Sequence, residues 1–442
     1  MFYPKTPFLG KGLLLENEIL KVHSSALPQL LPWLCQTPRI TTYRINTLRT
    51  DVADYKAKLQ NQLSERYGPK APKVFGLPEL PEMLCIAPLD TSADVGYEDC
   101  LKQLIVDTSC GAALLRGAHI FAPGVLAMET GTQLQEMVNV FADLPGKCKK
   151  GTATRYSCDE KIFLGVGQVL MQRHQLYNNN KEQPPSGIAV RMLTNVSGVP
   201  TLGDLSDEDA LLQNLPSIVC VRVLAPQPGE RVLDMCAAPG NKTTHIAELM
   251  GNVGTVIALD NSGSRVRGMQ SKLANYSCIA AHQFDATKAW DENGSGICMK
   301  PPYASSSFDR ILLDAPCSGL GNRPQLSCNI KQVKVLQSYP HIQRSLFSQA
   351  VPLLRPGGVL VYSTCTVTEA ECEQLVAWAL RRFPQLELVD ATPKLGSPGL
   401  PLPDLDAAQC ELLQRFGPSA ANRVKHLDTV GFFIAKFQKS LS

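Results

Sequence analysis

The sequence predicts an α/β protein whose C-terminal half folds as a doubly wound, mostly parallel sheet. Short apolar segments alternate with helical stretches from about residue 231 onward. A Pro/Gly turn follows the first apolar segment, and a cysteine follows each of two later ones. Alternation of this kind is typical of parallel sheets, and the carboxyl ends of their strands line a ligand crevice. We therefore expect the functional groups to follow the strands.

The composition is that of an ordinary globular protein. Of the 442 residues, 44% are hydrophobic and 19% are charged, and the net charge of +3 is too weak to establish a nucleic-acid partner. The 15 cysteines include no CxxC pair and have no regular spacing, which indicates neither a metal site nor a disulfide framework. Scattered cysteines fit a reducing compartment, so we expect a cytoplasmic protein. No apolar run approaches membrane-spanning length, and we expect no membrane association.

The first hundred residues contain one clear strand signal. The segment Arg39-Ile-Thr-Thr-Tyr-Arg-Ile-Asn-Thr-Leu-Arg49 alternates β-branched and basic residues, as a half-exposed strand does. Its arginines at positions 39, 44 and 49 have two interpretations, a solvated edge strand or contacts with phosphates. The sequence does not separate the two.

Residues 101–193 have a different pattern. Glycine and proline punctuate short apolar runs at 137–141, 162–167 and 188–192, which predicts a small β-barrel. Between the first two runs lies Lys147-Cys-Lys-Lys-Gly-Thr-Ala-Thr-Arg155, with four basic residues and no acidic one. Such a loop is either a solvated surface or a nucleic-acid contact.

The C-terminal half supplies the predicted sheet. A helix is clearest from Glu369 to Phe383, where apolar residues recur at helical spacing. The candidate strands are residues 231–234, 255–259, 308–313, 358–362, 386–389 and 431–437.

The turn after the first strand, Met235-Cys-Ala-Ala-Pro-Gly-Asn-Lys-Thr-Thr244, indicates a nucleoside site. It lacks the glycines of a phosphate-binding Walker A loop, and it has only Gly240 toward a dinucleotide fingerprint. What remains is adenosine binding without a pyrophosphate. Asp260, twenty residues past Gly240, would meet the ribose hydroxyls, and Asp285 would suit the adenine edge. S-adenosylmethionine fits such a pocket because it carries no phosphates.

Two cysteines follow two of the later strands. Cys317 lies in Asp314-Ala-Pro-Cys-Ser-Gly319 and Cys365 in Tyr362-Ser-Thr-Cys-Thr366. Free cysteines are often only small buried hydrophobic residues. Here the neighbouring proline, serine, glycine and threonine residues mark turns, which favours a nucleophile and a second, proton-handling thiol.

These three motifs, in this order, resemble those of the Nol/Nop/Sun-type RNA cytosine-5 methyltransferases. The resemblance covers residues 205–439 and the element Arg44-Ile-Asn-Thr-Leu-Arg49 of that family's N-terminal RNA-binding region. The block between them resembles a PUA domain, as in the PUA-containing animal branch of the family, whose substrates are transfer RNA acceptor ends and messenger RNA hairpins. Two positions depart from the family pattern: Asn241 replaces a glycine, and Cys372 replaces the asparagine of Glu-Asn-Glu.

The resemblance implies a Rossmann-like methyltransferase sheet with an inserted PUA barrel. It divides the chain into an N-terminal RNA-binding region (1–98 and 196–228), a PUA domain (99–195) and a methyltransferase domain (229–442). It implies a monomer that uses S-adenosylmethionine to methylate carbon 5 of cytosine in tRNA, with mRNA hairpins as a second substrate class. The implied cofactor-binding residues are Cys236, Ala237, Ala238, Pro239, Gly240, Asn241, Lys242, Asp260, Arg265, Asp285 and Asp314.

The resemblance also implies the catalytic roles. Cys365 adds to carbon 6 of cytosine, which makes carbon 5 nucleophilic, and Cys317 assists release when the carbon 5 proton leaves. Asp314 engages the base, and Lys242 either positions the base and lowers the thiolate pKa or is merely a solvated first-turn lysine. Arg116, Lys149 and Lys150 are the expected phosphate contacts.

Two rival functions remain at this stage. A non-catalytic RNA-binding protein would have lost one of the cysteines or Asp260, and all three are present. A nicotinamide oxidoreductase on the same sheet is disfavoured by the missing glycines.

Overall fold

The predicted α/β sheet is the largest sheet of the protein. The structure is a computed structural model that describes residues 3–8, 16, 27–89, 96–177, 184–202, 208–328, 330, 332–418 and 427–441. In this part of the chain the sheet has eight strands, seven in the order β13-β12-β11-β14-β15-β18-β16, with β17 paired to β18. Their bounds are β11 Arg231–Asp234, β12 Thr255–Asp260, β13 Ile279–Gln283, β14 Phe308–Asp314, β15 Leu354–Thr364, β16 Leu386–Val389, β17 Gln414–Phe416 and β18 Phe432–Lys439.

This sheet is mostly parallel, as predicted. Strands β11 to β15 are parallel to one another, and β18 runs antiparallel to both β15 and β16. The strand order reverses between β11 and β14, so the carboxyl ends of these two strands open the crevice where ligands bind in such sheets. Asp234 and Asp314 are the last residues of these strands.

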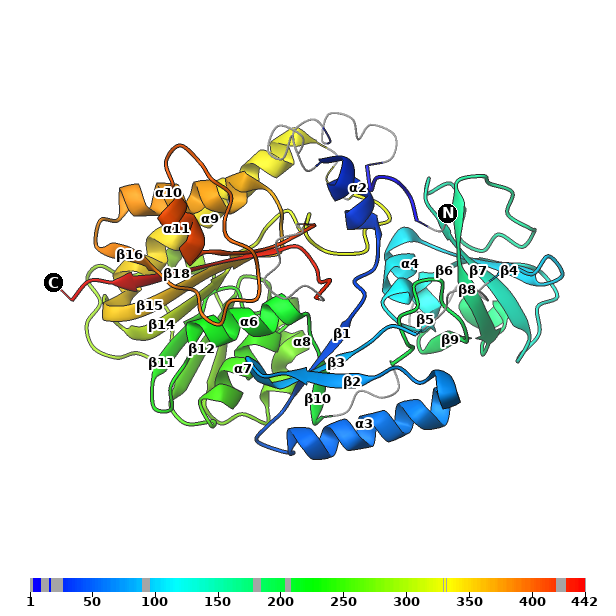
Figure 1. The fold of residues 1–442 in the computed structure, drawn as a ribbon, viewed down its shortest axis with the longest axis horizontal. Coiled ribbons are helices and arrows are strands. Elements are labelled where there is room, and N and C mark those ends of the chain that lie inside the picture. The colour runs from blue at the N-terminus through cyan, green and yellow to red at the C-terminus, as the bar shows by residue number, and fades with distance from the viewer. Residues whose placement is uncertain are drawn as a thin grey trace.

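Helices cover both faces of the sheet (Figure 1). Alternate strand residues such as Val232 and Leu312 pack beneath α6 (Leu215–Leu224) and α7 (Asn241–Leu249), and α8 (Gly263–Leu273) lies on the same face. Their neighbours Leu233 and Ile311 point to the other face, beneath α9 (Val333–Leu353) and α10 (Glu373–Arg382). The alternation of buried residues on both faces explains the near-continuous apolar strands. The remaining short helices here are η3 Ala286–Lys288, η4 Glu369–Glu371 and α11 Ala407–Leu412.

A second, six-stranded sheet lies at the opposite end of the molecule (Figure 1). Its order is β5-β9-β8-β7-β4-β6, and the runs predicted at 137–141, 162–167 and 188–192 lie in β7, β8 and β9. We call residues 101–193 the six-stranded unit. Its elements are β4 Lys102–Val106, α4 Thr108–Leu115, β5 Ile120–Phe121, η2 Ala122–Gly124, β6 Val125–Met128, β7 Met137–Asp143, β8 Lys161–Val169, α5 Arg173–Leu176 and β9 Ile188–Met192.

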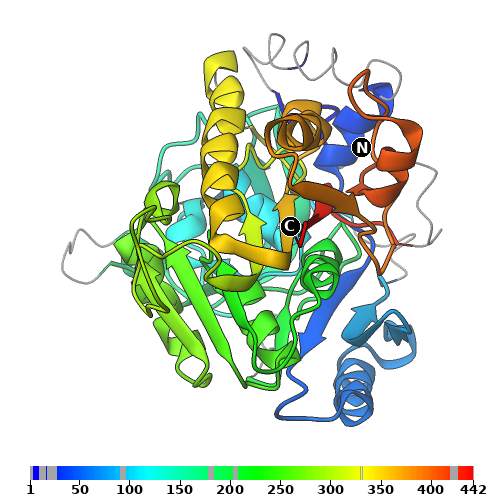
Figure 2. The same cartoon turned by 90° about the vertical axis from the view of Figure 1, so that its left-hand side faces the viewer.

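A four-stranded sheet lies between these two parts, with α3 at the lower edge of the molecule in both Figure 1 and Figure 2. Its order is β10-β1-β3-β2, so the chain leaves this sheet after β3 and returns to it at β10, after the six-stranded unit. Its elements, with the helix that precedes it, are α2 Leu27–Cys35, β1 Thr41–Ile45, α3 Val52–Tyr67, η1 Gly68–Lys70, β2 Val74–Leu77, β3 Leu80–Ile86 and β10 Ala210–Leu212.

Arg44 on β1 is buried, so neither interpretation of the N-terminal arginines holds for it. Only 2% of the residue is exposed. Its guanidinium donates to both carboxylate oxygens of Glu248 at 2.9 Å, to Thr244 Oγ1 at 2.8 Å and to the Asn241 carbonyl at 2.5 Å. Arg44 therefore fastens β1 to α7 and to the loop from which α7 starts. Arg49, by contrast, remains a partly exposed residue paired with Asp209.

Glu82 on β3 forms a second buried polar contact with the large sheet's helices. Its carboxylate lies 3.0 Å from His245 Nε2 and 2.8 Å from Arg222 Nε. Burial raises the pKa of Glu82, but the hydrogen bonds from His245 and Arg222 outweigh this effect and lower the pKa to about 2. The four-stranded sheet is therefore attached to α6 and α7 by an ionised carboxylate as well as by Arg44.

The predicted helix from Glu369 to Phe383 is interrupted near its start. A single 3₁₀ turn, η4, ends at Glu371, and α10 begins only at Glu373. Cys372 between them has φ −117° and ψ −101°, outside the helical region, and its side chain caps nothing. The helix breaks here because Glu371 is buried and its backbone carbonyl accepts a 2.6 Å hydrogen bond from the Tyr362 hydroxyl.

Among the residues that the structure describes, no helix has the length and the apolar composition needed to cross a membrane.

We expect Arg44→Met to destabilise the protein strongly. Removing one partner leaves the buried Glu248 carboxylate without its cation, which typically costs about 3–5 kcal/mol. Urea denaturation followed by circular dichroism measures this loss. Arg49→Met is the matched control, because the Arg49 pair on the same sheet is exposed and its loss should change stability far less. Equal losses of stability in the two variants would contradict the inference that Arg44 fastens β1 to α7.

Candidate active site

The structure brings the two strand-end cysteines into contact. Cys317 follows β14 and Cys365 follows β15, and these neighbouring strands are parallel, with Asp314 opposite Ser363. The two Sγ atoms are 3.2 Å apart. Both thiols therefore meet at one point of the carboxyl edge of the sheet.

The surroundings of the two thiols shift their pKa values in opposite directions. The hydrogen bond from Cys317 lowers the pKa of Cys365, with help from the Lys242 charge and the Asn322 amide and against burial. The same hydrogen bond, burial and the Glu371 charge raise the pKa of Cys317. Cys365 is thus the sulfur that ionises first, and Cys317 is its thiol donor.

Lys242 and Asp314 form an ion pair beside the cysteines. Lys242 Nζ lies 2.6 Å from Asp314 Oδ2, and Ser363 Oγ donates to Asp314 Oδ1 at 2.7 Å. Burial lowers the pKa of Lys242, but the charge and hydrogen bond of Asp314, together with the nearby Cys220 and Cys365, outweigh burial and raise the pKa overall, so Lys242 stays cationic. With its side chain only 14% exposed, Lys242 is not the solvated lysine of the alternative interpretation.

A cavity of about 540 Å³ opens beside this ion pair. Its walls include Lys242 and Asp314, Thr42 of β1, and Arg116 from the end of α4 in the six-stranded unit. Asn322, whose amide lies 3.7 Å from Cys365 Sγ, also lines it. The volume is in the range of small-ligand sites, and all three sheet regions contribute to the walls.

The loop between β11 and α7 forms one wall of the cavity. Its lining residues are Cys236, Ala237, Ala238, Pro239, Asn241 and Lys242. Gly240, which precedes the helix, has φ +89°, a conformation that favours glycine. The side chain of Asn241, the residue that departs from the family pattern, accepts a hydrogen bond from Lys272.

Asp260 and Asp285 lie at the ends of the next two strands along the same edge, outside the cavity walls. Asp260 ends β12 with its side chain 3% exposed, and its Oδ1 accepts from Ser262 N at 2.9 Å and from Arg265 at 3.0 Å. Asp285 is half-exposed and caps its own turn through Thr287. Carboxylates repel phosphates and accept hydrogen bonds from hydroxyl and amine groups, so this donor and acceptor set fits a nucleoside ligand without phosphates.

Asp234, at the end of β11, is a functional candidate that the sequence analysis missed. Its carboxylate is buried, Thr243 Oγ1 donates to Oδ2 at 2.7 Å, and Oδ1 has no partner among the described residues. Burial raises its pKa to about 7. Its position in an ordinary apolar strand offered no signal beyond the strand end itself.

The three residues that were expected to contact phosphates do not lie together. Arg116 lines the cavity, whereas Lys149 and Lys150 are exposed on the loop between β7 and β8 and do not line it. Lys147 of the same loop is 3.7 Å from Glu160, so the basic cluster is partly neutralised by an acidic residue beyond its end.

Arg323 is a second residue that the sequence analysis missed. It is 1% exposed and lines the cavity. Its guanidinium stacks 4.0 Å from the Trp33 ring centroid and donates to the Trp33 and Thr429 carbonyls, both at 2.7 Å. Arg323 thus joins α2 and the segment before β18 to the loop that follows Cys317. A lone arginine in a loop carries no sequence signal for such a role.

Comparison with known proteins agrees with this geometry. A family profile described as "16S rRNA methyltransferase RsmB/F" matches residues 221–438. The human tRNA (cytosine(72)-C(5))-methyltransferase NSUN6 is 40% identical over 437 residues, covering 93% of this chain and 91% of that protein. The tRNA (cytosine(72)-C(5))-methyltransferase of Pyrococcus horikoshii is 31% identical and covers 90% of this chain and 88% of its own length.

A solved structure is also similar over the whole chain. The crystal structure of NSun6 from Pyrococcus horikoshii with SFG has a TM-score of 0.73 and 27% identity, and covers 97% of this chain and 98% of its own. Sequence and fold therefore agree over nearly the full length. The chain belongs to the Nol/Nop/Sun-type RNA cytosine-C5 methyltransferases, the family that includes NSUN6.

Proposed function

We propose that this protein transfers a methyl group from S-adenosylmethionine to carbon 5 of a cytosine at the acceptor end of tRNA. The observation that carries the proposal is the pair of thiols 3.2 Å apart beside the Lys242–Asp314 ion pair. The relatives named above act on cytosine 72 of tRNA, which supports an acceptor-end target here. Membership of this family excludes the nicotinamide oxidoreductase alternative.

S-adenosylmethionine would lie along the carboxyl ends of β11, β12 and β13. The loop from Cys236 to Lys242 would hold its methionine portion, Asp260 and Arg265 its ribose side, and Asp285 its adenine. When bound, it supplies the methyl group that the activated carbon 5 accepts. The absence of a glycine-rich phosphate loop and the buried Asp260 carboxylate both support a ligand without phosphates.

Cys365 would activate the base by adding to carbon 6. Its sulfur is the more acidic of the pair, so it is the one available as thiolate. Asp314 would accept a hydrogen bond from the exocyclic amine, and Lys242 would stabilise the charge that develops on the base as sulfur adds. The base must leave its stack to reach this site, which costs least at frayed ends and loops.

Cys317 would complete the reaction. After methyl transfer, Cys317 takes the carbon 5 proton while it passes its own proton to the sulfur of Cys365. The electron pair of the carbon 5–hydrogen bond re-forms the carbon 5–carbon 6 double bond, and the carbon 6–sulfur bond breaks with its electrons on Cys365. Both cysteines are then thiols, and loss of one proton to solvent restores the starting pair.

RNA affinity would come from outside the catalytic sheet. We assign residues 99–195 as a PUA-type domain inserted between two parts of an N-terminal RNA-binding region, residues 1–98 and 196–228, ahead of the methyltransferase domain, residues 229–442. Support comes from the return of the chain to the four-stranded sheet at β10 and from Arg116 in the cavity wall. Activity on mRNA hairpins, a monomeric state and a cytoplasmic location stay predictions.

Replacing each of the two cysteines should stop the reaction at a different step. Cys365→Ala should abolish methylation and any covalent complex, because the adduct never forms. Cys317→Ala should stall after methyl transfer, leaving enzyme and RNA joined in a complex that survives denaturing electrophoresis. A denaturing gel with cytosine-containing tRNA and cofactor reads out both. A complex in Cys365→Ala but not in Cys317→Ala would reverse the assignment, and methylation by neither the wild type nor any variant would favour a non-catalytic RNA-binding protein.

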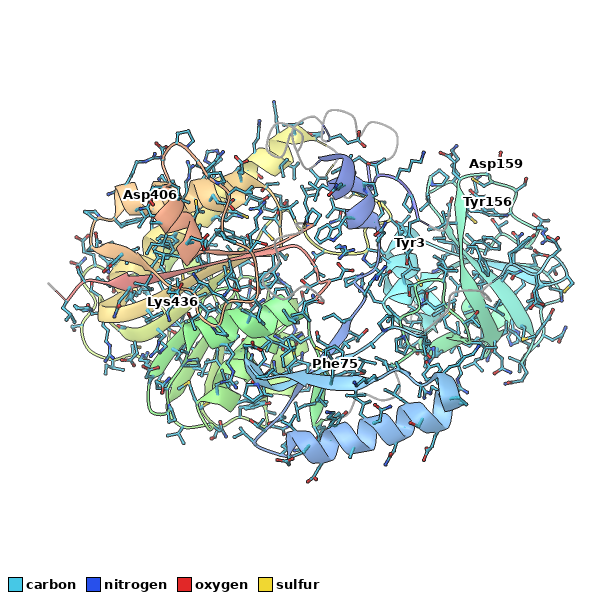
Figure 3. The ribbon with its side chains drawn as sticks, viewed as in Figure 1. Tyr3, Phe75, Tyr156, Asp159, Asp406 and Lys436 are labelled. Carbon is cyan, nitrogen blue, oxygen red and sulfur yellow. The ribbon has the colours of Figure 1, made fainter. Side chains whose placement is uncertain are left out.

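Asp260→Ala should weaken binding of S-adenosylhomocysteine by about 1–3 kcal/mol through lost hydrogen bonds to the ribose. Isothermal titration calorimetry measures the affinity. Asp159→Ala is the control, because this exposed carboxylate lies on the six-stranded unit, far from the strand ends (Figure 3). Unchanged affinity in Asp260→Ala, or binding of NADH instead, would contradict the assigned cofactor site.

The basic loop should contribute affinity for RNA without contributing to the chemistry. Replacing Lys149 and Lys150 with alanine should weaken tRNA binding and reduce its salt dependence by roughly one to two phosphate contacts. Filter binding over a range of salt concentrations measures the slope. Lys147→Ala is the control, because that charge already faces Glu160. An unchanged slope in the double variant would show that the loop is a solvated surface.

A further inference from the structure

A buried carboxylate lies behind the cysteine pair and has no part in the reaction described so far. Glu371 is 0% exposed and ends the turn η4. Its two oxygens accept five hydrogen bonds: from Ser318 N at 2.9 Å, Ser318 Oγ at 2.6 Å, Gln343 Nε2 at 3.0 Å, Thr366 Oγ1 at 3.3 Å and Thr368 Oγ1 at 2.8 Å. One carboxylate thus gathers donors from the two cysteine loops and from α9.

No lysine, arginine or histidine in the described part of the chain forms an ion pair with Glu371. The other glutamate of the same segment differs in this respect, because Glu373, also 0% exposed, is paired with Arg415 at 2.8 Å. A buried carboxylate without a cation is costly unless hydrogen bonds replace those of water. The five donors meet this requirement, and they come from the segments that carry the catalytic thiols.

The hydrogen bonds fix the chain on both sides of Cys317. The Pro316 carbonyl, on one side, accepts from Gln343 at 3.0 Å, and the Ser318 N–H, on the other, donates to Glu371. On the opposite loop, Thr366 directly follows Cys365, and its hydroxyl lies 2.7 Å from Ser318 Oγ. Glu371 is the group that these contacts share.

We propose that Glu371 is a positioning residue for the cysteine pair: its carboxylate locks the Cys317 loop against the Cys365 loop and so fixes Cys317 as the thiol partner of Cys365. The assignment of Cys317 to product release rests on the function proposed above. The locking of the two loops rests only on the hydrogen bonds around Glu371.

The charge of Glu371 acts in the same direction as its hydrogen bonds. A second negative charge on Cys317 would face both the Cys365 thiolate and the Glu371 carboxylate, and Coulomb repulsion disfavours that state. The pKa of Cys317 is raised first by its hydrogen bond to Cys365, then by burial, and further by the charges of Cys365 and Glu371. Cys317 thus keeps its proton beside Cys365, the sulfur that receives this proton during release.

Glu371→Gln tests the proposal, because it preserves shape but removes the charge and replaces one acceptor oxygen with a donor amide. The kcat for tRNA methylation should fall by about 10-fold to 100-fold, the cost of a displaced catalytic group, while the KM for tRNA stays within a factor of about two. A covalent enzyme–RNA complex should accumulate on a denaturing gel, as in Cys317→Ala. Thr368→Val removes a single hydrogen-bond donor to Glu371 and should give the same complex at a lower level. It is the alternative test if Glu371→Gln does not fold.

Glu373→Gln is the matched control. It removes an equally buried carboxylate two residues away, so it should lower the melting temperature without accumulating the complex. The inference would be overturned if Glu371→Gln lost activity only in proportion to its folded fraction and formed no covalent complex. A trapped complex in Cys317→Ala would at the same time uphold the proposed function. A missing complex in Cys317→Ala would instead overturn the release role of Cys317.

Thiol alkylation tests the locking independently of the reaction. Iodoacetamide labelling of the free enzyme, read by mass spectrometry at a series of pH values, follows Cys317 and Cys365 separately. In Glu371→Gln the labelling of Cys317 should speed up and its pH midpoint should fall. Labelling of Cys317 that is unchanged from wild type would overturn the inference, whatever the gel shows.

Discussion

The parallel pairing of β14 with β15 is the constraint on which the candidate site depends. It sets Asp314 opposite Ser363, whose hydroxyl donates to the Asp314 carboxylate at 2.7 Å. Strand β14 ends at Asp314 and β15 ends at Thr364, and the loops that follow them bring the sulfurs of Cys317 and Cys365 to within 3.2 Å. A slip of one residue in this register would invert the side chains of the slipped strand and separate the thiols.

The two cysteines have different charged neighbours, and this difference gives two chemically identical side chains different pKa values. Lys242 lies on the Cys365 side, where its charge lowers the pKa of that thiol, and Glu371 lies on the Cys317 side, where its charge raises the other. Asp314 balances Lys242 and keeps the cation in place. Of the two thiols, Cys365 is therefore the more acidic and Cys317 the one that keeps its proton more strongly.

The N-terminal region supports the catalytic sheet as well as extending it. Arg44 holds the carbonyl of Asn241, the first residue of α7, and Glu82 holds α6 and α7 from the neighbouring strand. The loop that begins α7 is thus positioned from both sides, by its own strand β11 and by the four-stranded sheet. The chain leaves this sheet for the six-stranded unit after β3 and returns to it at β10, so the sheet that holds α7 is also the one that flanks the six-stranded unit in sequence.

The sequence by itself determined the class of the large sheet, several of its strands to within a residue or two, and the motifs that carry the chemistry. Apolar alternation and turn residues are local signals, so β11, β16 and β9 were predicted with the bounds that the structure has. Tertiary structure decided the rest: that Arg44 is buried against Glu248, 204 residues away, that Arg116 faces the cavity, and that Glu371 breaks a predicted helix to bind both cysteine loops. A polar residue is buried only where distant segments supply its partners, and the sequence around it does not record which segments those are.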